Sequence, residues 1–152
     1  TLVEFIDYKC GYCKKAHVEV EKLLSTDGNI RFIIKEFPIL GEDSLKMSKF
    51  ALAVKIAHGD KAYKVVHDIL IKMKAAPSTK AFDRIINNLN LDKKLVQDAM
   101  ESPEVKGIIA DTRNLAEKLK ISGTPTFVMK DELIRGYVPF DALIELVTNK
   151  RG

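Results

Sequence analysis

Two cysteines separated by two residues follow directly on a short apolar segment near the start of the chain: Cys10-Gly11-Tyr12-Cys13. The segment before them, Leu2–Ile6, has one charged residue among apolar ones, which is typical of a central β-strand. A helical pattern runs from the cysteines to about residue 24, and the apolar segment 30–34 predicts a second strand. A strand, a helix and a strand with short links form a βαβ unit, so we expect parallel strands and a right-handed crossover.

The rest of the chain predicts a block of helices followed by a return to strands. Helical spacing and capping residues fill about 44–100, a segment too long to be a loop. A further helix starts at Ser102, residues 126–129 and 133–136 predict an antiparallel hairpin, and a last helix opens near Pro139. We therefore predict one α/β domain over 1–152, with its frame at about 1–43 and 101–152 and a helical subdomain inserted at 44–100.

The cysteine spacing is that of a redox pair, because two intervening residues bring both sulfur atoms within bonding distance across one helical turn. Cys10 lies where a helix begins, and the free N–H groups and helix dipole there favour its thiolate. We predict that Cys10 is the nucleophile and the more exposed sulfur, and Cys13 the more buried resolving thiol. Gly11 and Tyr12 lie between them and are expected to tune the pKa of Cys10. Lys14 and Lys15 add positive charge nearby.

A second interpretation is that the pair is half of a zinc site in a non-catalytic binding module or chaperone. Such a site needs two further ligands, and the remaining candidates are three histidines, His17, His58 and His67. His17 follows Cys13 by about one turn, but one histidine does not complete a tetrahedral site. We expect His58 and His67 to lie on the surface or on a helix face, and we predict neither a metal site nor an organic cofactor.

A glycine- and proline-containing loop is the second feature that bears on chemistry. Thr124-Pro125 opens the first strand of the predicted hairpin. That strand is expected to lie beside Leu2–Ile6, which places Pro125 next to Cys10.

One carboxyl group is expected inside the first strand. Glu4 lies six residues before Cys10 in an otherwise apolar segment. A partly desolvated carboxyl under the cysteines has a raised pKa and can exchange a proton with Cys13. The alternatives are a charge at a strand edge or an ion pair with Lys35. Asp7 is a candidate cap for the helix start.

Four segments together resemble the bacterial DsbA-like family, in the branch of the ScsC and alphaproteobacterial DsbA-like proteins: Val3–Lys14, Lys35–Gly41, Gly123–Phe127 and Gly136–Pro139. The resemblance covers essentially the whole chain. It implies a thioredoxin fold with an inserted helical subdomain, and an enzyme that exchanges disulfides with secreted proteins. Gly11-Tyr12 departs from the Pro-His of the best-known members, which puts a strongly oxidising potential in doubt.

The resemblance also implies roles for individual residues. Cys10 and Cys13 match the catalytic pair, Glu4 matches the buried acid of the first strand, and Thr124 and Pro125 match a loop with a cis peptide bond. The backbone of that loop, together with the residues between the cysteines, is expected to bind the substrate chain.

The family context implies export to the periplasm, unfolded or misoxidised secreted proteins as substrates, and a membrane redox partner. The direction of exchange stays open between a disulfide isomerase or reductase and an oxidase. The chain opens inside a strand at Thr1, which suggests a lost leader and a lost N-terminal extension. Some members form trimers through such an extension, and without it we expect a monomer.

Charge and hydropathy exclude other classes. The formal net charge of +4 comes from lysines spread along the chain and not from a clustered stripe, so we expect no nucleic-acid partner. No apolar run approaches the roughly 18 residues of a membrane span.

Overall fold

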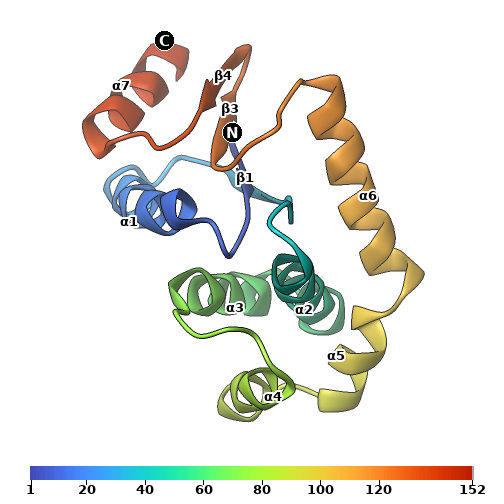
Figure 1. Ribbon diagram of the computed structural model, residues 1–152. Coiled ribbons are helices and arrows are strands. Elements are labelled where there is room, and N and C mark those ends of the chain that lie inside the picture. Colours follow the sequence, from blue (N-terminus) through green and yellow to red (C-terminus); the bar gives the residue numbers. More distant parts are fainter. Residues whose placement is uncertain (152) are drawn as a thin grey trace.

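The computed structural model describes residues 1–151, and its elements alternate between a small sheet and a set of helices (Figure 1). In chain order they are β1 Leu2–Ile6, α1 Gly11–Thr26, β2 Phe32–Glu36, α2 Glu42–His58, α3 Asp60–Lys72, α4 Thr79–Asn88, α5 Lys93–Met100, α6 Pro103–Lys118, β3 Thr126–Met129, β4 Glu132–Arg135 and α7 Phe140–Arg151.

The sheet has the strand order β2-β1-β3-β4, so β1 is an inner strand. β1 and β2 are parallel, which confirms the predicted βαβ unit. β3 pairs antiparallel with both β1 and β4, which confirms the hairpin and its position beside the first strand. The loop before β3 is thereby brought to the end of β1, where the cysteines begin.

Helices cover both faces of the sheet. Leu2 of β1 packs in one apolar cluster with Val20 of α1 and Leu143 of α7. Phe5 of β1 packs in another with Ala116 of α6. In Figure 1, α1 and α7 lie on one side of the sheet and α6 on the other. Since side chains alternate along a strand, Glu4 shares the face of Leu2, toward α1.

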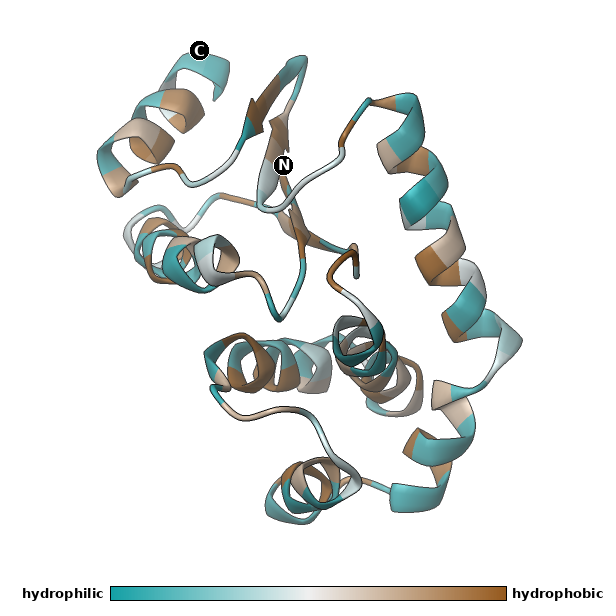
Figure 2. Ribbon diagram, viewed as in Figure 1, coloured by the Kyte–Doolittle hydropathy of each residue, from teal (hydrophilic) through white to brown (hydrophobic). Residues whose placement is uncertain are grey.

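Helices α2–α5 lie between β2 and α6 in the chain, which confirms the helical subdomain inserted in an α/β frame. Their apolar residues form one cluster that also includes Ile6 of β1 and Ile109 of α6. In Figure 2, brown hydrophobic residues alternate with teal hydrophilic ones along these helices. Phe50 of α2 stacks on Phe82 of α4 with ring centroids 4.3 Å apart. Gly59 separates α2 from α3 with φ +92°, a conformation that suits glycine.

The second strand is displaced from its predicted position by two residues. We predicted 30–34 from the apolar run, whereas β2 spans Phe32–Glu36. Pairing with β1 sets these limits, because the Leu2 N–H donates to the Arg31 carbonyl and the Phe37 N–H donates to the Ile6 carbonyl. Polar residues at the end of β2 are therefore part of the ladder.

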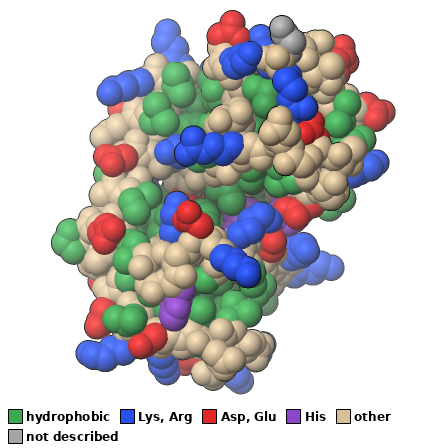
Figure 3. Space-filling model, turned by 180° about the vertical axis from the view of Figure 1, so that it is seen from behind, with side chains coloured by type: hydrophobic (Ala, Val, Ile, Leu, Met, Phe, Trp, Pro, Cys, Tyr) green, Lys and Arg blue, Asp and Glu red, His purple; other side chains and the backbone are tan. Residues whose placement is uncertain are grey.

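The surface carries charges of both signs. On the face drawn in Figure 3, lysine and arginine side chains are interspersed with aspartate and glutamate. Among residues 1–151, no helix has the length and apolar character that a membrane span requires.

Candidate redox site

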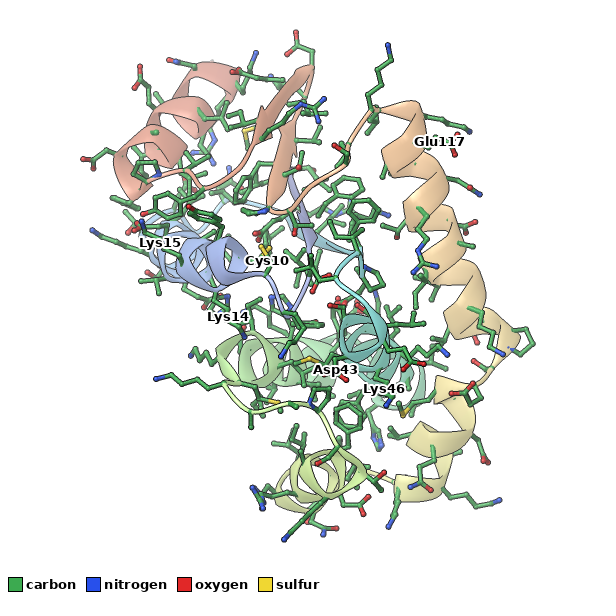
Figure 4. All side chains as sticks on the ribbon, in the orientation of Figure 1. Cys10, Lys14, Lys15, Asp43, Lys46 and Glu117 are labelled. Carbon is green, nitrogen blue, oxygen red and sulfur yellow. The ribbon has the colours of Figure 1, made fainter. Side chains whose placement is uncertain are left out.

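Cys10 and Cys13 lie at the junction of β1 and α1. Cys10 is the N-cap of α1 and has extended backbone angles, and its Sγ accepts a hydrogen bond from the Cys13 N–H at 3.2 Å. Figure 4 shows Cys10 at the start of α1, in the middle of the molecule. Both cysteines are buried, but Cys10 is 7% exposed and Cys13 is 1% exposed, so Cys10 is the more accessible of the two. Both cysteines are in the free thiol form.

The two thiols have opposite acidities. A hydrogen bond from the Cys13 thiol, together with the backbone N–H groups of Cys13 and Tyr12, lowers the pKa of Cys10 from 9.0 to about 6. The same thiol–thiol hydrogen bond, with burial, raises the pKa of Cys13 far above its ordinary value. At neutral pH the pair is therefore a Cys10 thiolate beside a Cys13 thiol, which is the charge distribution of a nucleophile and its resolving partner.

The side chains of Lys14 and Lys15, which follow Cys13, contact groups other than the cysteines. Lys14 Nζ donates to the carbonyls of Ile71 and Met73, at 3.0 and 2.8 Å, and so caps the end of α3. Lys15 Nζ lies 4.3 Å from the centre of the Tyr137 ring. The acidity of Cys10 comes chiefly from hydrogen bonds, and Lys14 has a further role that the sequence did not indicate: it joins the active-site helix to the helical subdomain.

The Thr124-Pro125 peptide bond is cis, as the family resemblance implied. The Cys10 thiol lies 3.3 Å from the Thr124 carbonyl and donates to it when protonated. Thr126 stabilises the loop by donating its hydroxyl hydrogen to the Gly123 carbonyl. The loop therefore adjoins the accessible sulfur. Tyr12, between the cysteines, is 65% exposed and presents its ring to solvent.

Glu4 is buried on the inner strand and is 3% exposed. It lies opposite Ile34 of β2, whereas Lys35 lies opposite Phe5 and so belongs to the other face of the sheet. Neither alternative reading of this residue, a strand-edge charge or a pair with Lys35, describes its position. Burial raises the pKa of Glu4 from 4.5 to about 8, and the Cys10 thiolate adds to the increase. That electrostatic coupling places the carboxyl in the field of the cysteine pair. Glu4 is therefore a protonatable group under the site with a pKa near neutrality.

Asp7 links the two loops that frame the site. It is fully buried and accepts four hydrogen bonds, from the N–H groups of Lys9, Ile39 and Leu40 and from the Ser44 hydroxyl. The loop after β1 is thereby held against the loop after β2. We considered Asp7 only as a helix cap, and its longer-range partners were not apparent from the sequence.

A buried polar network adjoins the site and was missed by the sequence analysis. Glu36, 1% exposed, accepts hydrogen bonds from Tyr8, Tyr63 and Ser48. Burial raises the pKa of Glu36 from 4.5 to about 7. His67 bonds to the hydroxyl of Tyr8 and is 2% exposed, so of the two positions expected for it, it takes the helix face and not the surface.

A signal for the burial of His67 exists in the sequence. His67 follows Tyr63 by four residues and precedes Leu70 by three, so it belongs to the apolar stripe of α3. A histidine on such a stripe is buried with its neighbours. His58, in contrast, is exposed, as expected, and its Nε2 accepts from the Asp92 N–H.

The cysteines are not part of any cluster of potential metal ligands among residues 1–151. The one such group in that range, His17, His67 and Asp68, contains neither sulfur. This arrangement favours the redox reading of the pair over the zinc half-site.

The chain is similar to solved structures of thioredoxin-like and thiol-disulfide exchange proteins. A thioredoxin-like oxidoreductase from Silicibacter pomeroyi is 38% identical with a TM-score of 0.90, over 99% of this chain and 85% of that one. The thiol-disulfide exchange protein α-DsbA2 from Wolbachia pipientis is 29% identical with a TM-score of 0.89, over 97% and 80%. ScsC from Proteus mirabilis is 28% identical with a TM-score of 0.87, over 99% and 82%.

Among curated proteins, the Na(+)/H(+) antiporter NhaA 1 of Salinispora arenicola is 27% identical over 150 residues. The match covers 98% of this chain but 23% of the antiporter, so the chain spans about a quarter of the length of that relative. The family model of the DSBA-like thioredoxin domain matches residues 1–147. The chain therefore belongs to the DSBA-like thioredoxin domain family.

Proposed function

We propose that the protein exchanges disulfides with protein substrates through Cys10 and Cys13. The observation that carries the proposal is the position of Cys10 Sγ at the start of α1, where it accepts a hydrogen bond from the Cys13 N–H at 3.2 Å. The pKa of Cys10 is lowered there to about 6, and that of Cys13 is raised. A thiolate at neutral pH, 7% exposed at a helix start, is the group that attacks a disulfide. Its low pKa also makes it a good leaving group in the reverse reaction.

In the reductive direction the Cys10 thiolate attacks one sulfur of a substrate disulfide. The Cys10–substrate bond forms, the substrate S–S bond breaks, and the second substrate sulfur leaves as a thiolate. Cys13 then loses its proton and attacks Cys10 Sγ, which forms the Cys10–Cys13 disulfide and releases the first substrate sulfur. Two electrons pass from the cysteine pair to the substrate. The oxidative direction is the reverse of these steps, and an isomerisation returns the Cys10 thiolate without using Cys13.

Glu4 is proposed as the group that takes the Cys13 proton. Its pKa of about 8 is close to the working pH, so the carboxyl exchanges a proton with little driving force in either direction. The Cys10 thiolate raises the pKa of Glu4, so the ionisation of Glu4 depends on the state of Cys10. When Cys10 becomes part of a disulfide, its negative charge is lost and Glu4 is easier to ionise.

The substrate chain is proposed to bind across the Thr124-Pro125 loop and the residues between the cysteines. A hollow of about 310 Å³ is lined by the residues from Ser122 to Thr126 together with Arg135 and Gly136. Exposed apolar side chains flank the site: Tyr12 between the cysteines, and Ile39 and Leu40 on the loop that Asp7 holds. Apolar surface with backbone groups at its centre suits unfolded polypeptide of varied sequence.

Substrates of this kind point to the periplasm, where disulfides form and persist. We propose secreted proteins with missing or incorrect disulfides as the substrates and a membrane redox protein as the partner that resets the cysteine pair. Both parts of this proposal rest on the chemistry of the site and on the family to which the chain belongs.

The test is exchange with a model disulfide peptide, followed by redox titration against glutathione. Wild-type protein should reduce the peptide, whereas Cys10→Ser should be inactive; activity retained by Cys10→Ser contradicts the mechanism. The titration then separates the directions. A potential as high as roughly −120 mV, that of DsbA, supports an oxidase, and a clearly lower one supports reduction or isomerisation.

A further inference from the structure

Three side chains that the exchange chemistry does not use meet where α1 packs beside α3. They are His17 of α1 and His67 and Asp68 of α3. One ring nitrogen of each histidine and one carboxylate oxygen of Asp68 all lie within 4.8 Å of one another. His17 Nε2 is 3.6 Å from Asp68 Oδ1. These are nitrogen and oxygen donors of the kind that bind first-row metal ions.

His17 has an unpaired nitrogen inside the protein. Among residues 1–151, its Nε2 is the one buried side-chain nitrogen or oxygen without a hydrogen-bond partner, and the residue is 6% exposed. The 3.6 Å to Asp68 is too long for a hydrogen bond. It is close to the roughly 3.3 Å between neighbouring ligands of a tetrahedral zinc ion whose bonds are about 2.0–2.1 Å long. A buried nitrogen without a hydrogen-bond partner costs free energy, and a ligand bound to His17 Nε2 would remove that cost.

The neighbours of His67 set which of its nitrogens is free. Tyr8 has one hydroxyl hydrogen, and it is donated to Glu36 Oε2 at 2.7 Å. The 2.9 Å contact between the Tyr8 oxygen and His67 Nδ1 is then a donation by the histidine. With the proton on Nδ1, Nε2 keeps its lone pair. A metal-binding histidine that donates its other N–H to a fixed acceptor is the usual arrangement at such sites.

The cluster is buried on one side and open on the other. The side chains of Asp68, Lys64 and Glu21 are 31%, 37% and 42% exposed and provide a route from solvent. Lys64 Nζ bridges Asp68 at 2.6 Å and Glu21 at 2.7 Å. Glu21 lies one turn after His17 on α1. The carboxylates of Asp68 and Glu21 attract a cation to this place. A metal ion that binds there competes with the Lys64 ammonium group for these carboxylates.

We propose that His17, His67 and Asp68 form a binding site for a divalent first-row transition metal, with zinc as the representative ion, between α1 and α3. Two imidazoles and a carboxylate leave a fourth position open for water or for Glu21. This site is separate from the cysteines, and it departs from the sequence-based expectation of no metal.

The test is calorimetric titration of zinc into protein whose cysteines are joined as a disulfide, so that no thiolate competes for the ion. Wild-type protein should bind one zinc ion per chain. His17→Gln and His67→Gln should each weaken binding by more than about tenfold, since loss of an outer partner alone typically costs 10–100-fold. The exposed His58→Gln is the matched control and should leave the affinity unchanged.

A second variant acts in the opposite direction. Lys64→Met removes the competing ammonium and should tighten zinc binding, whereas Lys61→Met, on an exposed position of the same helix, should not. Absence of binding by both wild type and Lys64→Met overturns the proposal, as does a folded His17→Gln variant with wild-type affinity. Because Lys64→Met does not alter a ligand, the proposal stays testable if His67→Gln does not fold.

Discussion

Cys10 and Cys13 are one helical turn apart, yet their surroundings move their pKa values in opposite directions. The difference arises from geometry at the helix start. Cys10 is the N-cap of α1, and its Sγ accepts a hydrogen bond from the Cys13 N–H at 3.2 Å, while Cys13 lies inside the first turn. The position in the chain, more than the residue type, makes one cysteine a nucleophile.

This acidity gives a prediction about pH. The rate of Cys10 alkylation by iodoacetamide should rise with pH with a midpoint at about 6 and level off above it. In Cys13→Ala the thiol hydrogen bond is gone, so the midpoint should shift upward toward 9.0. Alkylation rates measured over a pH series check both statements. A wild-type midpoint near 9.0 contradicts the account of the site.

Glu4 gives a second prediction at the same scale. Glu4→Gln keeps the shape of the protonated acid but accepts no proton, so the step in which Cys13 attacks the mixed disulfide should slow by roughly 100-fold. Formation of the mixed disulfide by Cys10 should change little. Stopped-flow measurement of the two phases separates them, and equal slowing of both phases would count against a role in proton transfer.

At the scale of elements, two loops are held together by one carboxylate. Asp7 accepts hydrogen bonds from the loop after β1, the loop after β2 and the start of α2. Asp7→Ala leaves several buried donors without an acceptor, so the free energy of unfolding should fall by more than about 3 kcal/mol. Asp111→Ala, at an exposed position of α6, should change it by less than about 0.5 kcal/mol. Urea denaturation measures both.

The elements that were predictable from sequence are those with local signals. Ser102 caps α6, where the sequence predicts a helix start, and β3 and β4 form the hairpin predicted over 126–129 and 133–136. The limits of β2 were not predictable from apolarity, because pairing with β1 extends the strand to Glu36. The Glu36 carboxyl group is buried at the end of β2, where it accepts hydrogen bonds from the hydroxyl groups of Tyr8 and Ser48, which are distant in the chain.

For the whole molecule, the Glu36 network is a polar connection between the sheet and the helical subdomain. It joins β2 to Tyr8, to Ser48 of α2 and to Tyr63 of α3. None of these contacts follows from sequence spacing, since the partners are 12 to 28 residues from Glu36. The cysteine pair, Glu4 and the Thr124-Pro125 loop were identifiable as candidates from sequence, but the network around them depends on tertiary packing.

The network has a consequence for stability. The pKa of Glu36 is raised in the folded protein, from 4.5 to about 7, so the folded state holds this proton more tightly than the unfolded state. The contribution of Glu36 to the free energy of unfolding is therefore fully present below about pH 4.5 and declines as the pH rises toward 7. Thermal unfolding of Glu36→Gln should show a smaller fall in Tm over this range than wild type. The exposed Glu145→Gln should follow wild type, and an identical profile for Glu36→Gln contradicts the prediction.

The central claim is that Cys10 is the nucleophile of a disulfide-exchange site, and trapping of the mixed disulfide tests it most directly. Cys13→Ser and Cys10→Ser are each incubated with a peptide that contains a disulfide, and the adducts are located by mass spectrometry. The account predicts a stable peptide adduct on Cys10 in Cys13→Ser and none in Cys10→Ser. An adduct on Cys13 in Cys10→Ser at a comparable rate, or no adduct in Cys13→Ser, contradicts it.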